Sequence, residues 1–139
     1  MTGIYFSGTG NTRYCIERFL DYYDGSKPVS IESPEAVEAI RKSNEIVFGY
    51  PVYYSNIPKI VRDFIYLNRD NFKNKKIFVL STMGLFSGDG AGCSARLLKK
   101  CGADIIGGLH LKMPDCIGDV KMLKKPLEKN RQLVKKRRE

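Results

Sequence analysis

Short apolar runs alternate with helix-forming segments along this sequence, and that alternation restricts the fold more than any other feature. The apolar runs occupy residues 2–7, 29–31, 45–50, 75–82 and 103–111. The run at 45–50 is apolar at consecutive positions, which is typical of a strand that is covered on both faces. Strands that alternate with helices indicate a parallel sheet wrapped by helices on both sides. We therefore predict an α/β domain with a five-stranded parallel sheet.

The segments between the apolar runs carry helical signals. Apolar side chains recur at helical spacing after the first run, Pro58 suits the first turn of a later helix, and Gly102 ends another. The predicted helices cover residues 11–23, 33–43, 58–70 and 93–102. At 139 residues the chain has the length of one ordinary domain, so we expect a single domain over residues 1–139.

The positive charge of the chain is concentrated at its C-terminal end. The formal net charge is +9, and residues 121–139 hold nine of the 24 Lys and Arg residues but only two of the 15 Asp and Glu residues. We expect a basic helix over about residues 119–139. No aromatic residues are interleaved with these charges, so a solvated helix face is favoured over a nucleic-acid site.

Composition also limits the compartment and the metal chemistry that we expect. No apolar run approaches the ~20 residues of a membrane span, and the first residues lack the pattern of a signal peptide. The four cysteines form no C-x-x-C motif, and the chain has one histidine. We therefore expect a cytoplasmic protein with free thiols, no membrane contact and no metal site.

The segment SGTGNT, residues 7–12, follows the first apolar run and precedes the first predicted helix. Glycine lets the backbone curl, and the N-terminus of a helix attracts anions, so this segment predicts a phosphate cradle built from uncharged donors. The Walker and dinucleotide glycine motifs are absent. Ser7 and Arg13 have the spacing of the Cys-x5-Arg loop of small tyrosine phosphatases, but Ser7 cannot supply the thiolate nucleophile.

Two further unusual segments follow the third and fourth apolar runs. Residues 51–57 read PVYYSNI, and residues 83–92 read MGLFSGDGAG. In parallel α/β sheets, ligands bind outside the carboxyl ends of the strands, where the strand order reverses. We therefore expect all three segments to lie at one edge of the sheet.

The motifs FSGTGNT, GYPVYYSNIPKIVRDF and STMGLFSGDGAG, in this order, resemble the three flavin-binding loops of flavodoxins. The closest resemblance is to the flavodoxin domain of a flavodoxin–ferredoxin fusion family common in anaerobic bacteria. The resemblance implies a flavodoxin-like three-layer sandwich with strand order 2-1-3-4-5 and FMN as cofactor.

The resemblance also implies which residues contact FMN. Those that would hold the phosphate are Ser7, Thr9, Gly10, Asn11 and Thr12. Those that would line one side of the isoalloxazine ring are Pro51, Val52, Tyr53, Tyr54, Ser55 and Asn56. Those that would line the other side are Thr82, Met83, Gly84, Leu85, Phe86 and Gly90. One of the adjacent tyrosines is expected to stack on the ring, and the sequence leaves open which.

The resemblance implies an FMN-binding electron-transfer protein with no catalytic acid–base residue. Because the tail is basic, we expect an acidic redox partner, such as a ferredoxin or ferredoxin domain. An FMN-dependent reductase of a small acceptor, such as a quinone or tetrapyrrole, is the alternative. A flavin-free anion-binding or phosphatase-like domain is a third possibility.

Overall fold

A computed structural model of the protein describes residues 1–53, 56–84 and 89–113. Its five strands form one parallel sheet in the order β2-β1-β3-β4-β5, which confirms the predicted fold class and strand order. The strands are β1 (Thr2–Tyr5), β2 (Val29–Ser30), β3 (Glu45–Pro51), β4 (Lys76–Met83) and β5 (Asp104–Lys112). The order reverses between β1 and β3, so the carboxyl ends of these two strands border the expected switch point.

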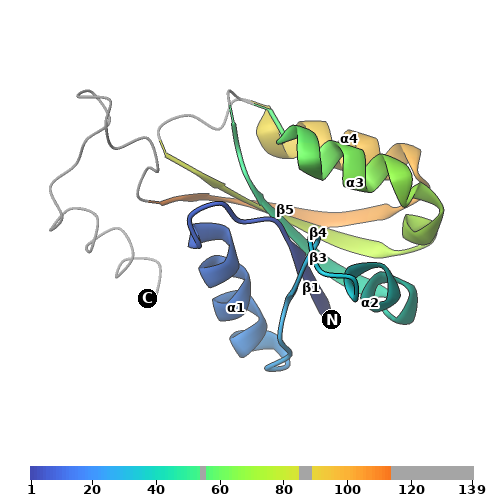
Figure 1. The fold of residues 1–139 in the computed structure, drawn as a ribbon, viewed down its shortest axis with the longest axis horizontal. Helices are drawn as coiled ribbons and strands as arrows, with labels where there is room; N and C mark the ends of the chain where they lie inside the picture. The colour runs from blue at the N-terminus through green and yellow to red at the C-terminus, as the bar shows by residue number, and fades with distance from the viewer. Residues whose placement is uncertain (54–55, 85–88, 114–139) are drawn as a thin grey trace, which may run out of the picture.

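Helices cover both faces of the sheet (Figure 1). They are α1 (Asn11–Tyr23), α2 (Ala36–Lys42), α3 (Lys59–Leu67) and α4 (Gly90–Lys100), with a 3-10 turn, η1 (Arg69–Phe72), after α3. Buried side chains of α2, α3 and α4 join one apolar cluster on one side of the sheet. The apolar side chains of α1 form a second cluster on the other side. The arrangement is the predicted three-layer sandwich.

Glycines in the strands allow α1 to lie close to the sheet. A Cβ atom at Gly49 would meet Ile16 Cδ1 at 2.2 Å, and one at Gly3 would meet Leu20 Cδ1 at 2.7 Å. Ile16 and Leu20 are fully buried, so neither can make room by moving into solvent. The absence of side chains at these two strand positions therefore sets the distance between α1 and the sheet.

The edge strand β5 exposes apolar side chains. Leu109 pairs with Leu80 of β4, and Leu80 belongs to the apolar cluster under α1. Leu109 itself is 39% exposed, and Ile106 is 47% exposed. Met113, directly after β5, is buried among the residues of the α1 cluster. The basic helix predicted for about residues 119–139 lies outside the described residues.

The bounds of three helices differ from the sequence prediction. The second helix begins at Ala36, three residues after the predicted start. The fourth helix begins at Gly90, three residues before the predicted start, so the last glycines of MGLFSGDGAG form its first turn. The third helix ends at Leu67, and the chain continues through η1. Within the described ranges, no helix has the length and apolar character needed to cross a membrane.

Candidate functional site

The carboxyl ends of β1, β3 and β4 are neighbours in the sheet, and they bring the three predicted segments to one edge. Tyr5 at the end of β1 pairs with Gly49 of β3, and Pro51 at the end of β3 pairs with Thr82 of β4. The chain leaves each of these strands directly into one of the three segments. The predicted clustering at a single edge is therefore confirmed at the level of the backbone.

The first segment turns from β1 into α1 through a left-handed residue. Gly10 has φ +92°, a conformation that side-chain-bearing residues rarely adopt, and its N–H donates to Ser7 Oγ at 3.0 Å. The helix follows at Asn11, and the first helical hydrogen bond runs from Tyr14 N–H to Gly10 O at 2.9 Å. The N–H groups in the first turn of an α-helix have no hydrogen-bond partner within the helix, and they point out of its N-terminal end, toward the first segment. This geometry suits a phosphate.

Thr82 connects all three segments. Its Oγ1 lies 2.7 Å from Thr12 Oγ1 in a buried hydrogen bond, which ties β4 to the first turn of α1. Its carbonyl oxygen accepts the Val52 N–H at 2.8 Å, which ties the second segment to the same residue. The two threonine side chains are almost completely buried. Thr82 therefore holds the three loop bases at set distances from one another.

Thr12→Val should lower the free energy of unfolding by about 1–2 kcal/mol, because it leaves the Thr82 hydroxyl buried without this partner. The double variant Thr12→Val/Thr82→Val removes both hydroxyls and should cost less than the sum of the two single variants. Urea denaturation of the apoprotein measures all three. Strictly additive losses would show that the two hydroxyls do not interact.

The second segment closes on itself and reaches the first. Tyr53 and Asn56 exchange two backbone hydrogen bonds, each 2.9 Å long. A Cβ atom at Gly8 would come within 3.0 Å of the Tyr53 hydroxyl oxygen, so the Tyr53 side chain extends over the first segment. Tyr53 is 38% exposed. This places one of the two candidate tyrosines beside the predicted phosphate cradle.

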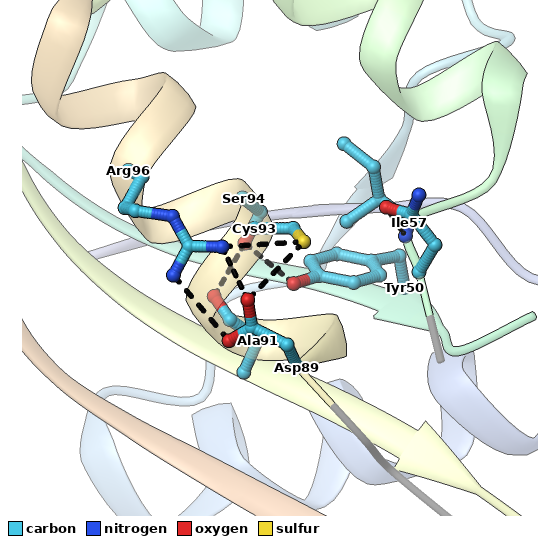
Figure 2. Close-up of polar contacts among 8 residues, drawn as sticks. Tyr50, Ile57, Asp89, Ala91, Cys93, Ser94 and Arg96 are labelled. Atoms are coloured by element: carbon cyan, nitrogen blue, oxygen red, sulfur yellow. Dashed lines mark hydrogen bonds and ion pairs between the residues drawn. The ribbon is translucent and has the colours of Figure 1, made fainter. Parts of the chain in front are cut away.

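The third segment leaves β4 at Met83 and Gly84 and returns at Asp89, the residue before α4. Figure 2 shows the Asp89 carboxylate in an ion pair with Arg96, two turns further along the helix, with the Cys93 sulfur beside both. The hydrogen bond from Arg96 lowers the pKa of Asp89. The ion pair is exposed, so it contributes little to stability.

The structure also reveals a buried link that the sequence did not indicate. Tyr50, near the end of β3, makes a hydrogen bond with Ser94 in α4 (Figure 2). Both side chains are fully buried. Tyr50 lies within the motif GYPVYYSNIPKIVRDF, but no motif links it to Ser94, and only the tertiary packing of α4 on β3 brings the two together.

The electrostatic character of the first two segments is neutral. Every polar side chain in residues 7–12 and 51–56 carries a hydroxyl or an amide. Arg13, the cation next to the first segment, pairs along the helix with Glu17 at 2.7 Å, and this hydrogen bond raises the pKa of Arg13. An arginine directed along the helix does not serve the phosphatase-like arrangement, in which the cation must face the loop.

The described residues fit a phosphate attached to a larger group, as the resemblance to FMN proteins implies. The left-handed turn at Gly10 and the first turn of α1 offer a cradle for the phosphate, and the described ends of the second and third segments lie at the same edge of the sheet. The described site residues lie together on the three loop bases: Ser7, Thr9, Gly10, Asn11, Thr12, Pro51, Val52, Tyr53, Asn56, Thr82, Met83, Gly84 and Gly90. The predicted contacts of Tyr54, Ser55, Leu85 and Phe86 lie outside the described residues.

Comparison with known proteins agrees with the fold. A family model described as "Flavodoxin domain" matches residues 4–102. Comparison with curated proteins finds no significant match.

Several solved structures share the fold. A two-electron reduced flavodoxin from Megasphaera elsdenii superposes with a TM-score of 0.69 at 23% identity, over 79% of this chain and 85% of that one. A flavodoxin from the domain Archaea gives a TM-score of 0.66 at 15% identity over the whole of both chains. A Fusobacterium nucleatum flavodoxin bound to flavin mononucleotide gives 0.58 at 15% identity, over 76% of this chain and 68% of that one.

Proposed function

Because the chain belongs to the flavodoxin domain family, we propose that it binds FMN at the carboxyl edge of β1, β3 and β4 and serves as an electron carrier. The observation that carries this proposal is the convergence of three loop bases on Thr82, next to the N-terminus of α1. FMN supplies the electron chemistry when it is bound, and the protein binds it and tunes it.

The chain's own residues divide the work of binding. The backbone of residues 7–12, the left-handed Gly10 and the first turn of α1 receive the phosphate. As the resemblance to flavodoxins implies, we expect the second segment with Tyr53 to cover one side of the flavin ring and the segment after β4 to cover the other. Thr82 holds these parts together through Thr12 and Val52.

An electron carrier is favoured over an enzyme by the side chains of the site. The first two segments carry hydroxyls and amides, and the titratable side chains among them are the phenols of Tyr53 and Tyr54, which are weak acids. A carrier needs a bound cofactor with an accessible edge and a partner that docks beside it. Such a site needs no acid or base of its own.

We propose an acidic ferredoxin, or a ferredoxin domain, as the redox partner. The support is charge complementarity, because the chain carries a net charge of +9 and iron–sulfur carriers of this type are usually acidic. The three motifs resemble those of a family in which the flavodoxin domain is fused to a ferredoxin domain. In such a fusion the flavin and the iron–sulfur cluster lie in one chain.

The test starts from FMN-loaded protein that has been reduced with dithionite and freed of the excess. Mixed anaerobically with oxidised ferredoxin, it should pass electrons in proportion to the protein added and faster than free FMN at the same concentration. Transfer no faster than that of free FMN would contradict a carrier role. Steady oxidation of NAD(P)H with a quinone, with no other protein present, would favour the reductase alternative.

The salt dependence of transfer tests the choice of partner. If docking to an acidic ferredoxin is electrostatic, the second-order rate should fall by about an order of magnitude between low and high salt, because ions screen exposed charges. Stopped-flow absorbance measures this rate, and a neutral quinone acceptor serves as the control. A rate that stays flat as salt increases would reject an acidic partner.

A further inference from the structure

Tyr50 of β3 packs with residues at the ends of the second and third segments. It is the residue before the last of β3, and its ring is fully buried in the same apolar cluster as Ile57 and Ala91. Ile57 is the last residue of the second segment, and Ala91 lies in the part of the third segment that forms the first turn of α4. In Figure 2 the ring lies beside Ile57 and its hydroxyl points toward Ser94. One side chain therefore shares an apolar cluster with the ends of both segments.

The direction of the hydrogen bonds follows from the number of protons available. Ser94 Oγ donates to the carbonyl oxygen of Ala91 at 3.1 Å. A serine hydroxyl has one proton, so the Tyr50 hydroxyl is the donor in its bond to Ser94 Oγ. Burial raises the pKa of Tyr50, so the phenol keeps its proton at physiological pH. The result is a chain of two hydrogen bonds from β3 into the first turn of α4.

The other polar contacts at the start of α4 are weaker constraints. Asp89 makes no side-chain cap hydrogen bond to the helix, and its ion pair with Arg96 is exposed to solvent. Exposed ion pairs are screened and contribute little. The Tyr50–Ser94 hydrogen bond is buried, and a hydrogen bond is stronger in the protein interior than in water.

We propose that Tyr50 is a positioning residue, which holds the first turn of α4 through Ser94 and so sets the spacing between the second and third segments. The inference rests on the proposed function, because these are the segments expected to enclose the flavin ring. Ring packing alone does not explain the tyrosine, because a phenylalanine would fill the same space against Phe48. The hydroxyl adds a directional link to the helix.

The test compares Tyr50→Phe, Ser94→Ala and the double variant with the wild-type protein. Tyr23→Phe is the matched control. It removes an exposed hydrogen bond from the Tyr23 phenol to Glu45, at the C-terminal end of α1 and away from the proposed flavin site. Fluorescence titration of each apoprotein measures the Kd for FMN and for riboflavin, which lacks the phosphate. Hydrogen exchange of the Cys93 amide, which is bonded to Asp89 O at 2.9 Å, reports on the first turn of α4 without any ligand.

A positioning role predicts that Tyr50→Phe raises both Kd values by the same factor, about three- to tenfold, the effect of one hydrogen bond. The Cys93 amide should exchange several-fold faster, and the double variant should bind no more weakly than Ser94→Ala. Tyr23→Phe should change neither quantity.

Two failures are distinguishable. If wild-type protein binds FMN and Tyr50→Phe binds it equally well, or leaves Cys93 exchange unchanged, the positioning role is wrong and the proposed function stands. If the wild-type protein itself does not bind FMN, the proposed function fails and the inference falls with it.

Discussion

Replacing Gly49 with alanine should lower the free energy of unfolding by about 1–3 kcal/mol, the usual cost of overpacking a well-packed core. The added Cβ atom would come within 2.2 Å of Ile16 Cδ1, 2.9 Å of Ile16 Cγ1 and 3.2 Å of Thr12 Cγ2. Rotation about χ2 can move Ile16 Cδ1, but Cγ1 is fixed by χ1, for which a β-branched side chain in a helix has one strongly preferred rotamer, and Ile16 is fully buried. The clash is therefore relieved by moving α1 away from the sheet.

The same displacement should weaken FMN binding, because α1 carries the phosphate cradle at its N-terminus. Urea denaturation gives the stability change, and fluorescence titration gives the affinity. Gly108→Ala is the matched control in a neighbouring part of the sheet, where the nearest atom to the added Cβ is Val79 O at 3.5 Å, an ordinary contact. If Gly49→Ala is as stable as Gly108→Ala, the close approach of α1 to β3 is not a constraint on this fold.

Replacing Asn11 with aspartate should change stability and FMN affinity in opposite directions. Asn11 is the first residue of α1, and the first turn contains no acidic residue. A carboxylate there interacts favourably with the helix dipole, so the apoprotein should gain about 0.3–1 kcal/mol. The same carboxylate lies beside the site proposed for the FMN phosphate, and like-charge repulsion should raise the Kd for FMN by about 30-fold or more.

Riboflavin separates charge repulsion from a general disturbance of the site. It has no phosphate, so its affinity for Asn11→Asp should stay within about twofold of the wild-type value, since no charged group of the ligand meets the carboxylate. Asn44→Asp, the same substitution before β3 at the opposite edge of the sheet, should leave FMN binding unchanged. Equal losses of FMN and riboflavin affinity in Asn11→Asp would place the phosphate elsewhere.

Much of the fold follows from local sequence patterns. The helix predicted over residues 11–23 has the same bounds in the structure, because its apolar spacing is regular and Gly10 precedes it. The common edge of the three segments also agrees with the prediction, as does the strand order, which the resemblance to flavodoxins implied and local patterns did not. In α4 the glycines at the start concealed the helical turn, because glycine is a poor helix former and common in loops.

The connections within the site could not be read from the sequence. The roles of Thr82 and Tyr50 depend on which residues face each other across neighbouring strands and helices, and no local motif encodes that pairing. The two candidate tyrosines illustrate the difference. The sequence treats them alike, whereas the structure places the Tyr53 hydroxyl beside Gly8.

An uncharged cradle at the N-terminus of α1 should hold a phosphorylated flavin. Fluorescence titration of the wild-type apoprotein with FMN, and in parallel with riboflavin, measures this. We expect one FMN per chain with a Kd of about micromolar or tighter, and riboflavin binding at least about tenfold weaker because it lacks the phosphate. No binding of FMN at micromolar concentrations, or equal affinity for the two flavins, would contradict it.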